Sequence, residues 1–280
     1  DDLFINLGKL KVLNLNSNKL SNVKNAFNGL NNVEELSLNS NNFRILNAYS
    51  FSSLNHTKLK KLHLNFCKIK IIETGAFYGL DNLLELSLDS NHLVAIEPYT
   101  FVGLPNLNTL ILSTMISLNR IESNSFYGLE NLKNLDLFLT NVNRINNFTF
   151  QHLAGLKSLR MGISKHLVLK IIPYGLQHFQ NLNQVDFLVF KCVQISEKAF
   201  FNFASKNDRT DMKFQVLEFA RAIDIDLYNF CGLLKLRQTV RVKSFKKFEF
   251  FTSNNLNIAD ESSFRNDSRF DNIKNPICYL

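Results

Sequence analysis

The sequence is poor in the residues that mark several classes of protein. Its 280 residues include only four Cys, four Pro and ten Gly, and no Trp. Four Cys are too few for a disulfide-dense scaffold, and so little Gly and Pro excludes collagen-like or low-complexity disordered protein. No apolar run approaches the roughly 18 residues that a membrane-spanning helix needs. The net charge of +8 permits an acidic partner without requiring one.

Leu, Asn and Phe are abundant instead, with 45, 38 and 26 copies. They recur in one frame, LxxLxLxxNxL followed by xxIxxxxFxxL, in which we number the first Leu as position 1. Successive copies begin 23 to 26 residues apart, a period typical of a solenoid whose units stack on one another. The eight clear copies begin at Leu10, Val33, Leu59, Leu83, Leu107, Leu132, Leu156 and Leu182.

Each position of the frame has a physical role. The LxL pair at positions 4 and 6 alternates as in a strand with one buried face. Asn at position 9 is predicted to be a buried amide that bonds backbone groups of its own turn and the neighbouring coil. Cys67, Thr140 and Ser164 keep part of that ability, whereas Met115 and Phe190 should interrupt the ladder. Phe at position 19 is predicted to stack along the convex side as a spine.

This repeat resembles the extracellular typical class of leucine-rich repeat. Toll-like receptors, variable lymphocyte receptors and Slit- and chaoptin-like adhesion proteins carry it. The resemblance covers Leu10 to about Phe203. It implies an α/β solenoid, or horseshoe, with a parallel β-sheet on the concave face and loops and short helical turns on the convex face.

We expect a single solenoid over residues 1–280, cut from a longer protein because the chain begins without a leader. The expected parts are the tail of a preceding repeat at 1–9, eight regular repeats at 10–205, divergent Phe-rich repeats at 206–271 and the start of a C-terminal cap at 272–280. A ninth repeat can be placed on Phe214 and Val216. The polar stretch from Asn207 to Asp211 is predicted to be a surface loop.

The resemblance implies the ligand-binding ectodomain of an innate-immune, Toll-like cell-surface receptor. Its partner would be a protein or microbial ligand bound on the concave or lateral face, and a membrane would be reached only through regions outside this sequence. Two alternatives stay open: a secreted or surface-anchored adhesion or recognition protein, and a structural repeat scaffold without a dedicated ligand. The repeat class also implies an extracellular or cell-surface location.

The residues predict no enzyme, no cofactor and no metal site. The sequence lacks a GxSxG elbow, a phosphate-binding loop, HExxH and GxGxxG. Its six His are scattered through different repeats, and the frame puts His63 outside the coil and Cys67 inside it. Binding is therefore the expected activity, because solenoids present extended concave surfaces.

The first candidate surface spans three adjacent repeats. Positions 7 and 8 are apolar there, whereas earlier repeats carry pairs such as Asn16-Ser17 and Asp89-Ser90. Position 5 of the same repeats alternates in charge. An exposed apolar patch would be a partner surface, and the alternative is burial beneath a local irregularity. The candidate residues are Phe138, Leu139, Ile163, Leu188 and Val189, with Asp136, Arg160 and Asp186 at position 5.

The second candidate is a basic stretch between residues 235 and 247 that contains no acidic residue. Alternation with apolar residues puts Arg241 and Lys243 outward on a strand. Such a patch could meet an anionic partner, and the alternative is a solvated strand face. The candidate residues are Lys235, Arg237, Arg241 and Lys243.

The sequence also contains candidate glycosylation sites and four cysteines. Three N-x-S/T sequons, at Asn55, Asn147 and Asn266, are predicted N-glycosylation sites. The repeat frame puts Asn55 and Asn147 off the concave face. Cys67 and Cys192 fall at core positions, so both are expected to be buried free thiols. Cys231 is expected near the surface, where Cys278 is one candidate partner.

Overall fold

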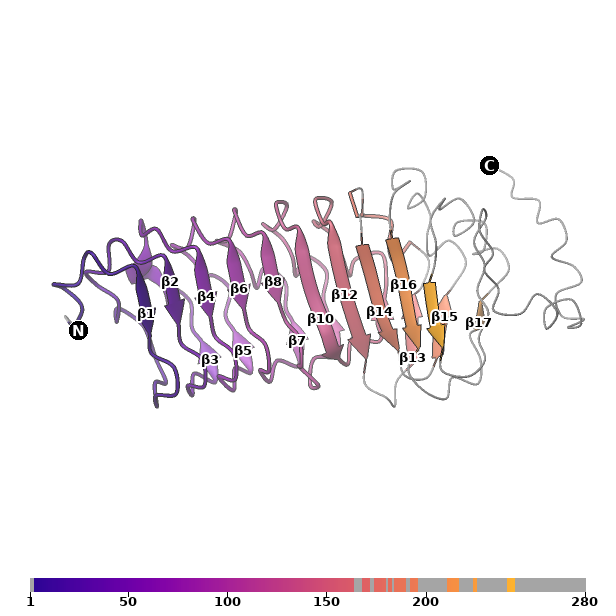
Figure 1. Ribbon diagram of the computed structural model, residues 1–280, viewed down its shortest axis with the longest axis horizontal. Coiled ribbons are helices and arrows are strands. Elements are labelled where there is room, and N and C mark those ends of the chain that lie inside the picture. The colour runs from indigo at the N-terminus through magenta and orange to yellow at the C-terminus, as the bar shows by residue number, and fades with distance from the viewer. Residues whose placement is uncertain are drawn as a thin grey trace, which may run out of the picture.

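The computed structural model describes residues 3–163 and eight short segments after them: 168–171, 174–179, 181–182, 184–189, 192–195, 211–216, 224–225 and 241–244. Side chains are described for residues 3–162, 174–179 and 181–182. Over these residues the chain winds into an elongated row of coils (Figure 1). We number the coils by the repeats of the sequence, so that coil 1 begins at Leu10 and coil 8 at Leu182.

Each coil contributes one strand to a parallel sheet that has ten strands within the described residues. The strands pair at equal positions of the repeat, so that Leu36 lies between Leu13 and Leu62. The sequence frame is therefore the structural repeat, and the predicted solenoid with a parallel sheet is confirmed. The strands are β1 (Val12–Asn14), β2 (Glu35–Ser37), β4 (Lys61–His63), β6 (Glu85–Ser87), β8 (Thr109–Ile111), β10 (Asn134–Thr140), β12 (Ser158–Ile163), β14 (Gln184–Val189), β16 (Asp211–Val216) and β18 (Arg241–Ser244).

A second set of short parallel strands lies on the returning half of the coils. Two-stranded sheets join β3 (Ile45–Leu46) to β5 (Ile71–Ile72) and β7 (Ala95–Ile96) to β9 (Arg120–Ile121). A four-stranded sheet contains β11 (Arg144–Ile145), β13 (Val168–Ile171), β15 (Cys192–Ile195) and β17 (Asp224–Ile225). The sequence analysis did not predict these strands. Of the helical turns that it did predict, the described residues contain one, the 3₁₀ helix η1 (Ser52–Leu54).

The interior is a continuous row of aliphatic side chains. In coil 4, Leu83, Leu86 and Leu88 are fully buried and Leu93 is nearly so. One coil is too small to enclose these side chains, so each coil is covered by its two neighbours. Stacking therefore supplies the core that a single repeat lacks.

A spine of Phe rings runs along the returning side, as predicted. Phe51, Phe77, Phe101 and Phe126 are buried, and their ring centroids follow one another at 6.1, 6.2 and 6.1 Å with interplanar angles of 4°, 16° and 6°. The spacing falls within the 4.5–7 Å range typical of aromatic pairs. The stacked rings thus align the convex side of each coil with the convex side of the next coil.

The predicted position 9 ladder is also present. Asn91 is buried, and its Nδ2 donates to the carbonyls of Leu64 (2.8 Å) and Leu88 (2.7 Å). Its Oδ1 accepts from the backbone N–H of Cys67 (3.1 Å) and Ile69 (3.0 Å). One amide thus satisfies four backbone groups in two coils, which would otherwise be buried without partners.

The substitutes for Asn at position 9 retain fewer bonds. The Cys67 thiol donates to the Leu38 carbonyl at 3.1 Å, and the Thr140 hydroxyl donates to the Leu137 carbonyl at 3.1 Å. Met115 is fully buried and fills the same place with a thioether, a weak acceptor that cannot donate. The amide ladder therefore breaks in coil 5, as the sequence predicts.

The later predictions fall mostly outside the described residues. These include Ser164 and Phe190, most of 206–271, the cap at 272–280, and Cys231 and Cys278. Where the backbone is described, β16 contains Phe214 and Val216. The predicted loop from Asn207 to Asp211 is wrong at its last residue, because Asp211 opens β16 and pairs with Gln184 of β14.

Candidate ligand-binding surface

Positions 7 and 8 follow the short strands of coils 1 to 5 and lie at the ends of the longer strands β10, β12 and β14. They line what we call the C-terminal edge of the sheet. In the first coils, position 7 accepts hydrogen bonds from the next coil. Asn16 Oδ1 accepts from Asn39 N (2.7 Å), Asn39 Oδ1 from Asn65 N (2.8 Å), and Asn65 Oδ1 from Asp89 N (2.9 Å). Asp89 Oδ1 then accepts from Ser113 Oγ at 2.6 Å. Sequence reasoning missed this second polar ladder, although the recurrence of Asn and Asp at position 7 was its signal.

Position 8 adopts a left-handed backbone in the first six coils, with φ between 54° and 59° at Ser17, Ser40, Phe66, Ser90, Thr114 and Leu139. Left-handed φ is uncommon for bulky residues. Phe66 adopts this conformation all the same, and its side chain is 58% exposed. Ile116, at position 10 of coil 5, is 68% exposed. The C-terminal edge therefore presents an apolar side chain in coil 3, and Ile116 lies two residues beyond this edge in coil 5. The sequence analysis did not single out either residue.

The polar ladder ends in coil 6, where position 7 is Phe138. The Arg160 guanidinium lies 4.0 Å from the centroid of the Phe138 ring, and Arg160 Nη1 is 3.2 Å from Asp136 Oδ2. A Cβ on Gly162 would lie 2.8 Å from Phe138 Cδ2, so the glycine leaves the space that the ring occupies. We call Asp136, Phe138, Leu139 and Arg160 the Phe138 platform.

The platform is neither a fully exposed patch nor a buried irregularity. The pairing of β10 with β12 shifts between Leu137 and Thr140, so the backbone is irregular at Phe138 and Leu139. Both side chains are half-buried. Half-burial leaves part of each side chain free for contact with a partner.

The sheet brings the other predicted residues onto neighbouring strands. Asp136, Arg160 and Asp186 are direct backbone partners across β10, β12 and β14, which alternates acidic and basic residues along the row. Leu188 pairs with Gly162. Only the backbone is described for Asp186, Leu188, Ile163, which ends β12, and Val189, which ends β14.

The predicted basic stretch is partly described. Arg241 and Lys243 lie in β18, which pairs with β16 so that Arg241 is opposite Lys213 and Lys243 is opposite Gln215. A third basic residue is therefore a cross-strand neighbour of the stretch. Lys235 and Arg237 lie outside the described residues.

Two of the three sequons are described. Asn55 is exposed just after η1, and the buried Thr57 hydroxyl donates to the Leu54 carbonyl at 2.7 Å. Asn147 is half-buried, and its carbonyl lies 2.6 Å from His178 Nε2. Both asparagines lie off the ten-stranded sheet. Asn266 lies outside the described residues.

His63 and Cys67 occupy separate environments. His63 faces Ser37 Oγ (3.4 Å from Nδ1) and Glu85 Oε1 (3.5 Å from Nε2). Burial raises the pKa of the Cys67 thiol, so its reactive thiolate form is disfavoured. Cys67 is a buried free thiol, as predicted, whereas the Cys192 side chain lies outside the described ones. Within the described residues, no three or more His, Cys, Asp or Glu side chains gather as metal ligands.

Comparisons with family models and known sequences point to one repeat class. A family model described as "Leucine rich repeat" matches residues 57–114, and one described as "BspA type Leucine rich repeat region (6 copies)" matches residues 1–67. No curated protein matches the chain. In the part of the chain that the structure describes, no helix has the length and apolar character that a membrane crossing requires.

Solved structures show the same fold. The TLR13 chain of a TLR13–ssRNA13 complex matches with a TM-score of 0.63 and 26% identity over 86% of this chain, which spans 37% of that chain. A chain of the mouse RP105/MD-1 complex matches with a TM-score of 0.57 and 18% identity, over 85% of this chain and 42% of that one. Human 5T4, also called trophoblast glycoprotein, matches with a TM-score of 0.55 and 16% identity, over 74% of this chain and 76% of that one.

Proposed function

We propose that this chain, a leucine-rich-repeat protein in the style of Toll-like receptor ectodomains, is the ligand-binding part of an innate-immune cell-surface receptor. Solenoids of this kind serve as binding scaffolds because their stacked coils form one extended surface. The similarity to TLR13 supports the receptor assignment at 26% identity. The chain spans about a third of the TLR13 chain, so signalling would depend on other regions of the receptor.

We assign ligand binding to the Phe138 platform. The observation that carries this assignment is the Arg160 guanidinium held 4.0 Å above a half-buried Phe138 ring. Aromatic residues and Arg are enriched at protein interfaces and among the residues that dominate binding energy. Asp136 fixes the guanidinium in place, so less side-chain entropy is lost when a partner binds.

The platform favours a protein ligand. Two further exposed apolar side chains lie towards coil 3: Phe66 on the same edge, and Ile116 two residues beyond that edge in coil 5. An apolar surface flanked by a charged pair matches the composition of a protein interface, with an apolar centre and a polar rim. Asn55 and Asn147, where we propose N-glycans in an extracellular location, lie off the sheet and would leave this edge open.

The test is a binding screen against a panel of purified secreted and cell-surface proteins. We expect at least one protein to bind the wild-type chain and to lose roughly tenfold or more in affinity with Arg160→Gln or Leu139→Asp. Val94→Asp is the matched control, because Val94 is 48% exposed and lies outside the C-terminal edge. It should bind as wild type does.

Secretion and thermal unfolding separate a folding defect from a binding defect. Arg160→Gln changes a half-exposed side chain, so this variant should stay folded even if Leu139→Asp does not. The assignment of the platform would be contradicted if every protein that binds the wild-type chain also bound Arg160→Gln and Val94→Asp with equal affinity.

A further inference from the structure

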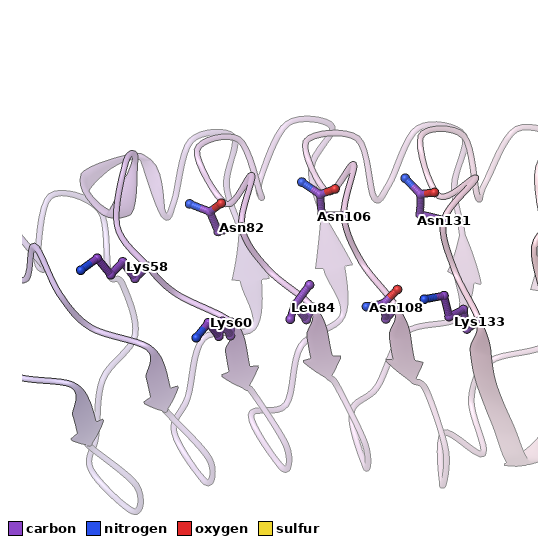
Figure 2. A pocket seen from close by; sticks show the side chains of 8 residues that line it. All are labelled: Lys58, Lys60, Asn82, Leu84, Asn106, Asn108, Asn131 and Lys133. Atoms are coloured by element: carbon purple, nitrogen blue, oxygen red, sulfur yellow. The ribbon is translucent and has the colours of Figure 1, made fainter.

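A groove lies at the opposite edge of the sheet, where the strands begin. It has a volume of about 560 Å³ and is lined by two rows of side chains from coils 2 to 6, which Figure 2 shows at and above the start of the strands. One row precedes position 1 of each coil, and the other immediately precedes β4, β6, β8 and β10. The lining residues are Lys58, Lys60, Asn82, Leu84, Asn106, Asn108, Asn131 and Lys133.

Three asparagines of the upper row are held in place by a third ladder. Asn82 Nδ2 donates to the Thr57 carbonyl (2.8 Å), Asn106 Nδ2 to the Asp81 carbonyl (2.8 Å) and Asn131 Nδ2 to the Pro105 carbonyl (2.9 Å). Each bond uses one of the two amide hydrogens and leaves the side-chain oxygen free. The three asparagines therefore present a fixed series of donors and acceptors, one for each coil.

The charge of the groove is entirely positive. Lys58 and Lys133 are exposed, and neither has an ion-pair partner among the described side chains. Lys60 shares Glu34 with Lys11, at 2.9 Å and 3.6 Å, and the hydrogen bond and charge of Lys60 lower the pKa of Glu34. No carboxylate is among the lining residues. Three carboxylates are adjacent in sequence to lining residues: Asp81 and Glu130 belong to the loops that precede the upper row, and Glu85 lies in β6, with its Oε1 3.5 Å from His63 Nε2.

The lining also decides what kind of anion the groove suits. It contains no aromatic side chain, so the bases of a single-stranded nucleic acid would find no stacking platform. Amides exchange hydrogen bonds readily with hydroxyl groups, and Leu84, 37% exposed, offers an apolar contact between the lysines. Parallel strands lie about 4.8 Å apart, so four coils span roughly 14 Å, the reach of an extended oligomer.

We propose that this groove binds an acidic oligosaccharide, a chain of sugars that carry sulfate or carboxylate groups. The anionic groups pair with Lys58 and Lys133, whereas Lys60 divides its charge between the ligand and Glu34. The sugar hydroxyls bond the Asn82, Asn106, Asn108 and Asn131 amides. This site is separate from the Phe138 platform and from the basic stretch near Arg241, so it does not depend on the proposed receptor function.

The experiment measures binding of the 280-residue chain to a fluorescent, fully sulfated heparin hexasaccharide. The comparison ligands are the same hexasaccharide without sulfate and a single-stranded oligonucleotide of equal charge. We expect the sulfated sugar to bind tightest. Lys58→Gln with Lys133→Gln should weaken that binding roughly tenfold, because two solvent-exposed ion pairs are lost.

Two matched controls test whether the groove or the total charge is responsible. Lys24→Gln with Lys70→Gln removes the same charge from exposed lysines outside the groove and should leave affinity within about twofold, a margin set by screened distant charges. Asn108→Asp places a carboxylate in the groove, where the Asn108 amide has no hydrogen-bond partner among the described residues, and should abolish binding. Asn22→Asp changes charge equally at an exposed site and preserves the oxygen that accepts from Lys24 N, so it should bind normally.

Two outcomes would overturn the proposal. If both lysine double variants weaken binding equally, the interaction is with total charge and the groove is not the site. If the oligonucleotide binds as tightly as the sulfated sugar and is equally sensitive to Asn108→Asp, the groove binds nucleic acid instead. Thermal unfolding of every variant confirms that each is folded.

Discussion

Asparagine has a different task in each row of the solenoid because its side chain both donates and accepts. At position 9 the amide is buried and satisfies four backbone groups, as at Asn91. At position 7 its oxygen accepts from the next coil, and before position 1 its nitrogen donates to the previous coil. Only the buried row replaces water completely, so we expect the largest energetic effects there.

Replacing Asn91 with Ala should lower the free energy of unfolding by roughly 2–4 kcal/mol, because buried carbonyl and N–H groups of coils 3 and 4 lose their partner. Urea unfolding followed by circular dichroism measures the change. Asn28→Ala is the control, since Asn28 is exposed and its side chain makes no hydrogen bond to any residue that the structure describes. Equal effects of the two substitutions would show that the amide ladder contributes little.

At the scale of single elements, the repeat frame predicted the strands, the position 9 ladder and the Phe spine because each depends on one residue type at one position. It did not predict the edge ladders, whose residues are part-buried at position 7 and exposed before position 1 and carry no hydrophobic period. The contact of Arg160 with Phe138 was also beyond sequence reasoning. It depends on two strands at once: the irregular end of β10, and the register of β12 together with the space left by its Gly162.

The turns between elements require glycine where the backbone is left-handed and tightly packed. Gly103 has φ +97°, and a Cβ there would lie 3.1 Å from the Phe77 carbonyl oxygen. We therefore expect Gly103→Ala to lower stability by about 1–3 kcal/mol. Gly8→Ala is the matched control, because a Cβ at Gly8 makes ordinary contacts at 3.5 and 3.6 Å. Thermal unfolding of both variants measures the change, and Gly8→Ala should unfold as the wild type does. An equal loss of stability at both sites would count against the strain argument.

The whole molecule is a one-dimensional stack, so stability should vary along its length. In coil 1, Val12 is 57% exposed and the core leucines are only partly buried, whereas the core of coil 4 is almost completely enclosed. Hydrogen exchange measured by mass spectrometry should show amides of β6 exchanging at least about tenfold more slowly than those of β1. Uniform exchange in both coils would instead indicate one global unfolding event.

The direction of the ladder bonds has a consequence for how the protein is made. The Asn82, Asn91 and Asn106 amide nitrogens all donate to a carbonyl of the coil that precedes them in the chain. A ribosome delivers the N-terminal coils first, and domains generally fold in that order during synthesis. Each emerging coil therefore meets, in the preceding coil, the carbonyl acceptors that its own amide nitrogens need. The solenoid can grow by addition at one end, and no finished coil has to reopen to admit the next.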